Sequence, residues 1–183
     1  KHAQENKLRL DFFSWHRYHI KPEQYASDVA DVTQWLFFTP EYISIPRVIS
    51  EWGFNSDIDA GYDQNLSAAH SIAAIRHSLY GYQQLFAFEL VDGPDPQNQI
   101  FWGRWGLLTH PKFGARIKPR YLAFDLINQL KGKRLVLKGE GTWVKGIASQ
   151  EDKIIRVILS NYDIHNQHME VVPVTFVNLK SPA

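Results

Sequence analysis

The chain has 183 residues, a length that fits one full domain or parts of two. Hydrophobic residues make up 44%, which excludes a disordered chain, and no apolar run approaches the ~20 residues that a membrane span needs. The net charge of +1, without a basic cluster, argues against a nucleic-acid surface, and the absence of cysteine excludes disulfides, thiolate metal sites and cysteine nucleophiles.

Three units, each a short apolar strand followed by a helix, are predicted in chain order. The predicted strands are Leu8–Trp15, Ile45–Ser50 and Leu85–Val91. None alternates cleanly between apolar and polar residues, which is typical of parallel strands covered on both faces. The helices are marked by Pro22, by Asp63 as N-cap with Gly81 as C-cap, and by Pro119 with Gly132. In the third helix the inward residues are expected to be Leu122, Ala123, Leu126, Ile127 and Leu130.

The spacing of these strands predicts a parallel sheet. The strand centres Phe12, Ile49 and Ala87 lie 37 and 38 residues apart, as right-handed crossovers through a helix require. An open doubly wound sheet would carry a glycine-rich phosphate turn after a strand, and none is present. A barrel would place polar residues at the carboxyl ends of several strands, as found here. We therefore predict an α/β fold in which residues 1–134 are the C-terminal portion of a (β/α)8 TIM barrel.

From about Leu135 the pattern changes to successive antiparallel strands. The predicted strands are Leu135–Lys138, Gly141–Ala148, Lys153–Ser160 and Met169–Val177, with a hairpin turn at Gln150-Glu151-Asp152. Residues 135–183 are accordingly expected to form part of an antiparallel β-sandwich domain. Because a complete barrel has eight strand–helix units, the chain is expected to be cut at both ends, with the remaining barrel on a missing segment or a second chain.

Glu51 is the strongest candidate for catalysis. It follows a buried strand and precedes Trp52-Gly53, so it is expected to project from the strand's carboxyl end into a cleft. A carboxylate in that place can act as a nucleophile on an anomeric carbon if a second carboxyl group protonates the leaving oxygen. A structural glutamate paired with Arg17 or Arg47 is the alternative, and the residues alone leave both open.

Other polar and aromatic residues fall at the same strand ends. His16 and Tyr18 could hold the Glu51 carboxylate, or could be a capping histidine and a packed tyrosine. Glu89 and Asp92 could bind sugar hydroxyls or act as acid groups, or have a structural role in the loop that follows. Aromatic walls for a sugar ring could come from Trp15, Trp52, Trp102 and Trp105, although each is more often a core residue. The eight histidines lack metal-ligand spacing, so neither a metal nor a cofactor is expected.

Three segments, taken together, resemble glycoside hydrolase family 39, the family of β-xylosidases and α-iduronidases. They are Asp11–Tyr18, Ile49–Gly53 and Phe101–Leu108, which look like strands six, seven and eight of that barrel. The resemblance covers roughly residues 8–130, and the tail resembles the family's C-terminal β-sandwich. One departure is Glu89-Leu90-Val91-Asp92, where family members more often carry Trp-Thr-Phe-Ser-Asp, so xylosidase-like specificity is not implied.

The resemblance implies a retaining double-displacement mechanism with Glu51 as nucleophile and with His16 and Tyr18 as the His-x-Tyr pair beside it. The family's acid/base glutamate follows an asparagine on strand four, and nothing in this chain matches it. The expected partner is therefore a carbohydrate, together with the remaining barrel. The alternatives are a non-catalytic carbohydrate-binding or scaffold module and, less favoured, a sugar-modifying enzyme of another class. The sequence indicates no compartment: secreted, periplasmic and cytoplasmic locations all remain open.

Overall fold

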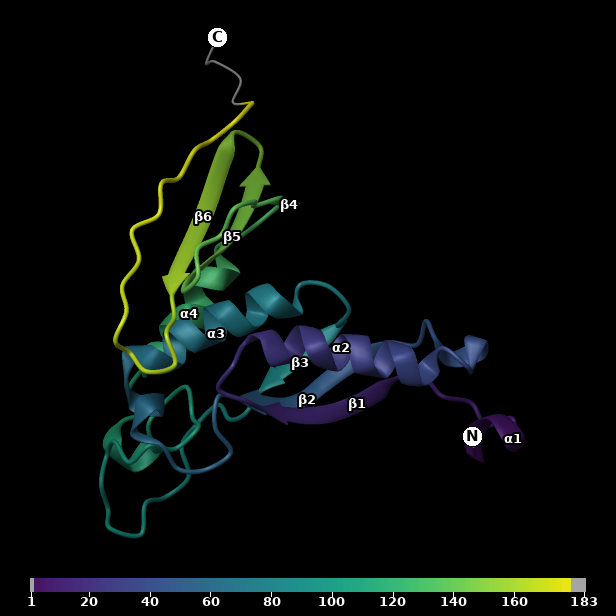
Figure 1. The fold of residues 1–183 in the computed structure, drawn as a ribbon. Coiled ribbons are helices and arrows are strands. Elements are labelled where there is room, and N and C mark those ends of the chain that lie inside the picture. Colours follow the sequence, from purple (N-terminus) through teal and green to yellow (C-terminus); the bar gives the residue numbers. More distant parts are fainter. Residues whose placement is uncertain (1, 179–183) are drawn as a thin grey trace.

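The computed structural model describes residues 2–178, which form two three-stranded sheets joined through two helices (Figure 1). The helices and strands, in chain order, are α1 (His2–Glu5), β1 (Phe13–Tyr18), α2 (Glu23–Leu36), β2 (Arg47–Gly53), α3 (Asn65–Ser78), β3 (Gln84–Ala87), α4 (Pro119–Asn128), β4 (Lys133–Leu135), β5 (Val144–Glu151) and β6 (Ile154–Asn161). Three 3-10 turns lie between them: η1 (Pro40–Tyr42), η2 (Ala60–Asp63) and η3 (Pro111–Phe113). No helix within this range is long and apolar enough to span a membrane.

The first sheet is parallel, in the order β1-β2-β3. Trp15 pairs with Ile49, and Ile49 pairs with Leu85. The three predicted strand–helix units are therefore present, although β1 begins later than expected. Pairing starts where the Phe13 N–H donates to the carbonyl of Pro46 at 2.8 Å, and the preceding Leu8, which was expected in the strand, is 45% exposed. All three strands end at the same edge, where the long loops gather (Figure 1).

The core lies on one face of this sheet. Its fully buried members come from α2, β2 and α3, and they are Tyr25, Ile49, Trp52 and Ala74. On the other face Phe12 and Phe86 are 58% and 54% exposed. Among the described residues the helices α2, α3 and α4 all pack on the same side of the sheet, so its other face is left uncovered.

The buried face of α4 overlaps the predicted one only in part. Of the residues expected inward, Ala123 is buried and Ile127 and Leu130 are partly buried, whereas Leu122 and Leu126 are 51% and 46% exposed. Arg120, which was not expected inward, is buried. The reason is that α4 packs against α3, where the Ser71 hydroxyl accepts from the Arg120 side chain.

The second sheet is antiparallel, in the order β4-β5-β6. The predicted hairpin is present, with Asp152 at its tip in the left-handed region (φ 52°). Gly132, at φ +77°, leads into β4, and a Cβ on it would lie 2.3 Å from the carbonyl oxygen of Gln150, so a side chain is excluded there. The fourth predicted strand, Met169–Val177, is wrong: this segment has no strand assignment and runs as an irregular strap beside the sheet (Figure 1).

The two sheets meet through α3, which packs against β5 and β6. Arg76 of α3 makes two hydrogen bonds of 2.9 Å to Glu140, and Ser160 of β6 donates to the Ala69 carbonyl at 3.1 Å. The Tyr162 hydroxyl, just after β6, donates to the Ile20 carbonyl at 2.7 Å. The boundary expected between residues 134 and 135 falls inside β4.

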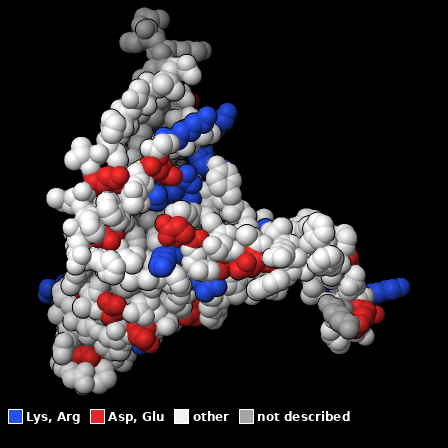
Figure 2. All heavy atoms as spheres, in the orientation of Figure 1, with Lys and Arg blue, Asp and Glu red and all other residues white. Residues whose placement is uncertain are grey.

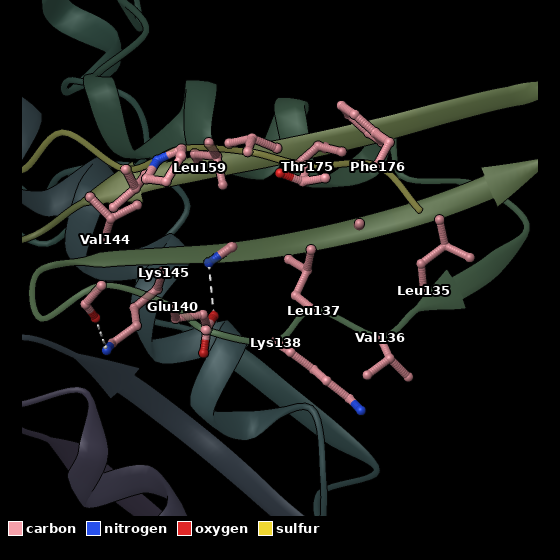
Figure 3. A pocket seen from close by; sticks show the side chains of 18 of the residues that line it. Leu135, Val136, Leu137, Lys138, Glu140, Val144, Lys145, Leu159, Thr175 and Phe176 are labelled. Atoms are coloured by element: carbon pink, nitrogen blue, oxygen red, sulfur yellow. Dashed lines mark hydrogen bonds between the residues drawn. The ribbon is translucent and has the colours of Figure 1, made fainter. Parts of the chain in front are cut away.

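The tail encloses an apolar hollow of about 270 Å³ between its sheet and the strap (Figure 3). Most of its lining is aliphatic or aromatic and includes Leu135, Leu137, Val157, Leu159, Val174 and Phe176. Two charged residues lie at its rim. Glu140 accepts from the Gly146 N–H at 3.0 Å, and Lys145 donates to the Gly141 carbonyl at 2.9 Å (Figure 3). This hollow is lined by residues of the tail alone, so it belongs to the tail's own packing rather than to the strand ends.

Candidate active site

A bulge between β1 and β2 determines where the Glu51 side chain lies. Trp15 pairs with Ile49 but the next residue, His16, pairs with Glu51, so Ser50 is an extra residue in β2. Ile49 and Trp52 are both fully buried although they are three residues apart, which regular alternation forbids. Ser50 and Glu51 consequently both lie away from the helix-covered side of the sheet.

Two side chains from β1 contact the Glu51 carboxylate. The Tyr18 hydroxyl donates to Oε1 at 2.6 Å, and His16 Nδ1 lies 3.4 Å from Oε2. The side chains of His16 and Glu51 are 60% and 26% exposed, so the carboxylate is held on one side and open to solvent on the other. Burial, followed by the hydrogen bond to Glu51, raises the pKa of Tyr18 well above its usual value. Tyr18 is thus a neutral donor at any physiological pH, suited to orienting an anionic oxygen.

Neither arginine that could have paired with Glu51 does so. Arg17 is bound by Asp28 of α2 through two hydrogen bonds of 2.5 and 2.7 Å. Arg47 reaches the carbonyl of Ile43 at 3.5 Å. Among residues 2–178 the only group that forms an ion pair with Glu51 is the imidazole of His16. The structural ion-pair alternative for Glu51 therefore lacks its proposed partners.

Gly53 leaves the space in which Tyr18 reaches Glu51. A Cβ at this position would lie 2.3 Å from the Tyr62 hydroxyl and 2.9 Å from Cε1 of the Tyr18 ring. Each ring is held by its hydroxyl: that of Tyr62 donates to the carbonyl of Asn55 at 2.6 Å, and that of Tyr18 donates to Glu51. The glycine after Trp52 is thus required by close approach of two aromatic rings, which sequence reasoning did not foresee.

Gly53→Ala is therefore expected to push Tyr18 away from Glu51 and to lower stability by about 1–3 kcal/mol through overpacking. Thermal unfolding would measure the cost, and the tyrosine hydroxyl proton in NMR spectra would report the lost hydrogen bond. Gly93→Ala is the control, since its φ is not positive and its Cβ would meet only the Arg104 guanidinium at 3.6 Å or more, an ordinary contact distance. Equal effects of the two substitutions would contradict the close-packing argument.

Trp52 does not form an aromatic wall. It is fully buried, with its ring edge-on to Tyr25 at 5.8 Å and to Phe124 at 5.9 Å. The prediction that it contacts substrate is wrong in this structure, because the bulge at Ser50 turns Trp52 toward the helices. Trp15 lies on the same side, packed against Tyr82 at 5.5 Å.

Asp92 is likewise buried and engaged within the protein. Its carboxylate accepts from Lys118 Nζ at 3.0 and 3.1 Å and from the Gly106 N–H at 2.7 Å. Lys118, whose side chain is fully buried, also pairs with Asp63 at 2.7 Å. Burial raises the pKa of Asp92 despite these contacts. The prediction that Asp92 binds sugar hydroxyls is wrong here: it joins the loops after β2 and β3 to the start of α4. Asp63, expected as a helix cap, does the same, and Gln64 precedes α3.

Glu89, Trp102 and Trp105 gather around an arginine at the end of β3. Arg104 donates to the Glu89 carboxylate at 3.0 Å, and its guanidinium carbon lies 3.8 Å from the centroid of the Trp105 ring and 5.5 Å from that of Trp102. The indole N–H of Trp105 donates to the Asp57 carbonyl at 3.2 Å. All four side chains are partly exposed, so this cluster can contact a ligand. Arg104 was not predicted, although its place between two tryptophans was a usable signal.

Charge and metal chemistry do not distinguish any other part of the described chain. On the face drawn in Figure 2, acidic and basic side chains are interspersed, and no broad area carries one sign of charge. Residues 2–178 contain no group of three or more metal-ligating side chains placed to hold an ion.

Comparisons with known proteins identify the fold. No protein-family model and no curated protein sequence matches the chain. A family 39 β-xylosidase from Caulobacter crescentus matches with a TM-score of 0.70 and 23% identity, over 85% of this chain and 34% of its own. The family 39 enzyme from Xanthomonas axonopodis pv. citri gives 0.75 and 19%, over 93% and 36%. A glucosidase from Croceicoccus marinus gives 0.71 and 22%, over 87% and 35%.

The chain has the fold of the C-terminal part of a family 39 glycoside hydrolase. The resemblance predicted from three sequence segments is therefore confirmed at the level of fold. The chain spans about a third of the length of these solved relatives, so the activity of a whole family 39 enzyme is not carried over with the fold.

Proposed function

We propose that this chain is the C-terminal part of a retaining glycoside hydrolase, with Glu51 as its nucleophile. Residues 1–134 would supply the last three strand–helix units of a (β/α)8 barrel, and residues 135–183 part of a β-sandwich domain. The observation that carries the proposal is the carboxylate of Glu51, held by Tyr18 at 2.6 Å, flanked by His16 and open on its other side. A nucleophile needs this combination of fixed orientation and access.

In the proposed reaction Glu51 attacks the anomeric carbon of a bound glycoside. A carboxylic acid protonates the leaving oxygen, and water then hydrolyses the glycosyl ester on Glu51 with the same acid group acting as base. In the described residues Glu89 and Asp92, the acidic groups predicted at the neighbouring strand end, are engaged by Arg104 and Lys118. The acid/base group therefore comes from the remaining barrel, placed about 5–5.5 Å from Glu51 as retaining enzymes require.

The remaining barrel, on a further segment or a second chain, is the proposed macromolecular partner. It would cover the sheet face on which Phe12 and Phe86 are exposed and pair with the free edges of β1 and β3. The other proposed ligand is a carbohydrate, with Arg104, Trp102 and Trp105 as candidate walls of its site.

A non-catalytic carbohydrate-binding or scaffold module is the second candidate. It is favoured by one observation, namely that the acidic residues expected near Glu51 are already paired within the protein. In that case the aromatic–arginine cluster would bind sugar without turnover.

Covalent trapping separates the two candidates. The complete protein is incubated with 2-deoxy-2-fluoro glycosides activated with a dinitrophenyl leaving group, and the labelled peptide is identified by mass spectrometry. We expect stoichiometric label on Glu51, since the fluorine slows hydrolysis of the glycosyl ester more than its formation. Label on another carboxylate would overturn the assignment of Glu51, and binding of sugar without any label would support the scaffold alternative.

A further inference from the structure

Arg120 is a buried arginine that no prediction from the sequence included. It lies in the first turn of α4 with 1% of its surface exposed. No carboxylate among residues 2–178 forms an ion pair with it, in contrast to Arg17, Arg76 and Arg104. A buried unpaired charge is costly, so the groups that hold this one need an explanation.

Its donors converge on the carboxyl ends of the parallel strands. Nη2 donates to the carbonyl of Trp52 at 2.9 Å, and Nη1 donates to those of Phe88 at 2.8 Å and Trp105 at 3.3 Å. Nε donates to the Ser71 hydroxyl on α3 at 3.3 Å. Trp52 directly follows Glu51 in β2, and Phe88 directly follows β3. A single rigid guanidinium therefore joins the end of β2, the end of β3 and the loop that carries Trp105.

Aromatic rings around the guanidinium stabilise its charge, although no carboxylate of the described residues pairs with it. The rings of Trp52, Tyr62 and Phe124 lie 4.9, 5.7 and 5.9 Å from its central carbon, which offsets part of the lost hydration. Burial lowers the pKa of Arg120, but an arginine starts so far above neutrality that it stays protonated. The ionisable groups that feel its charge are Tyr18, Tyr25, Tyr62 and His70.

One of these groups is the donor to Glu51. The positive charge of Arg120 opposes the rise in the pKa of Tyr18, and Tyr18 in turn donates to the Glu51 carboxylate. The other ionisable groups around the Tyr18–Glu51 pair are His16 of β1, Tyr62 of η2 and Arg120 of α4. Within that set only Arg120 is a permanent cation, and it acts from the buried side of the sheet, opposite to the side that solvent reaches.

We propose that Arg120 is a positioning residue for Glu51. Its fork fixes the backbone of β2 immediately after the nucleophile, and its unpaired charge makes the Tyr18 hydroxyl a stronger donor to the Glu51 carboxylate. Arg120 does not touch the substrate. The inference rests on the proposed function, since it assigns a role in preparing the nucleophile of that same site.

Three variants of the complete protein test the role in catalysis. Arg120→Gln removes the charge and most of the fork, Arg120→Lys keeps the charge, and Arg76→Gln breaks the contact to Glu140 on the far side of α3 as a structural control. Arg120→Gln is expected to lower kcat about 100-fold, the cost of displacing a reacting group by roughly 1 Å, with KM changed only a few-fold.

Arg120→Lys keeps the charge and part of the hydrogen bonding, so it is expected to recover part of kcat. Arg76→Gln should lower Tm without changing kcat. If kcat of Arg120→Gln, measured well below its Tm, equalled that of the original protein, or if KM rose as much as kcat fell, Arg120 would be a structural residue and the inference would be overturned.

His70 gives a readout that needs no enzymatic activity. Burial, with a smaller contribution from Arg120, lowers the pKa of this histidine to about 3. Its ring resonances in NMR titrations are expected to show a higher pKa in Arg120→Gln and an unchanged one in Arg120→Lys. This result supports an uncompensated charge on Arg120 even in a protein without glycosidase activity. The same His70 titration in the original protein, Arg120→Gln and Arg120→Lys would overturn the proposed role of that charge.

Discussion

Glu51→Gln is expected to abolish turnover by the complete protein, lowering kcat by several orders of magnitude while leaving the fold intact. Glutamine keeps an oxygen that accepts from Tyr18, so the contact of 2.6 Å can persist. It carries no negative charge, however, and a neutral amide cannot form the glycosyl ester. Steady-state kinetics and thermal unfolding together measure the two halves of this expectation.

Glu23→Gln is the matched control, because Glu23 lies on α2 with its side chain 61% exposed. It should leave kcat unchanged. Glu51→Ala should regain part of its activity with azide or formate, which fit the vacated space and attack the anomeric carbon in place of the carboxylate. Near-full activity of Glu51→Gln, or failure of both anions to restore any activity to a folded Glu51→Ala, would return Glu51 to a structural role.

Lys118→Met is expected to give the largest loss of stability among the substitutions considered, about 3–5 kcal/mol. The ammonium group is fully buried between Asp63 at 2.7 Å and Asp92 at 3.0 Å, and it also donates to the Arg104 carbonyl at 2.6 Å. Removing it leaves two carboxylates in the interior without a cation. Urea denaturation, with the free energy of unfolding extrapolated to water, would measure the change.

Arg156→Met provides the comparison, since Arg156 pairs with Glu151 at 3.2 Å where both side chains are substantially exposed. An exposed pair contributes about 0–1 kcal/mol, so this variant should unfold close to the original protein. If the two substitutions cost the same, the Asp63–Lys118–Asp92 cluster would not be the link between the loops and α4 that its geometry indicates.

The strand–helix units were predictable because each rests on local pattern. Apolar runs, Pro22, Gly81 and Pro119 all report on neighbours within a few residues, and parallel strands bring their carboxyl ends together whatever the details. This is why Glu51, Tyr18 and His16 could be expected to meet. Trp52 was misplaced because a one-residue bulge leaves no mark on hydropathy, yet it reverses which neighbours face the helices.

The buried charges were not predictable for a different reason. A charged residue in a helix is expected on the surface, and the groups that satisfy Arg120 lie far along the chain: the Trp52 carbonyl is 68 residues away and the Phe88 carbonyl 32. Lys118 and Asp92 are 26 residues apart. Only the folded arrangement of the loops brings such partners together. The predicted strand Met169–Val177 failed similarly, since its apolar residues find no neighbouring strand to pair with in the described chain.

The extra residue Ser50 also fixes how far Glu51 stands along the strand axis. Without it Glu51 would sit one residue earlier, a retreat of about 3.3 Å. The two catalytic carboxylates are about 5–5.5 Å apart in retaining glycosidases and about 6.5–9.5 Å apart in inverting ones. The gap between these two ranges is about 1 Å, which is smaller than this retreat. Under the proposed function, Ser50 would act in the assembled barrel as a spacer that bears on the anomeric configuration of the product, without contacting the sugar.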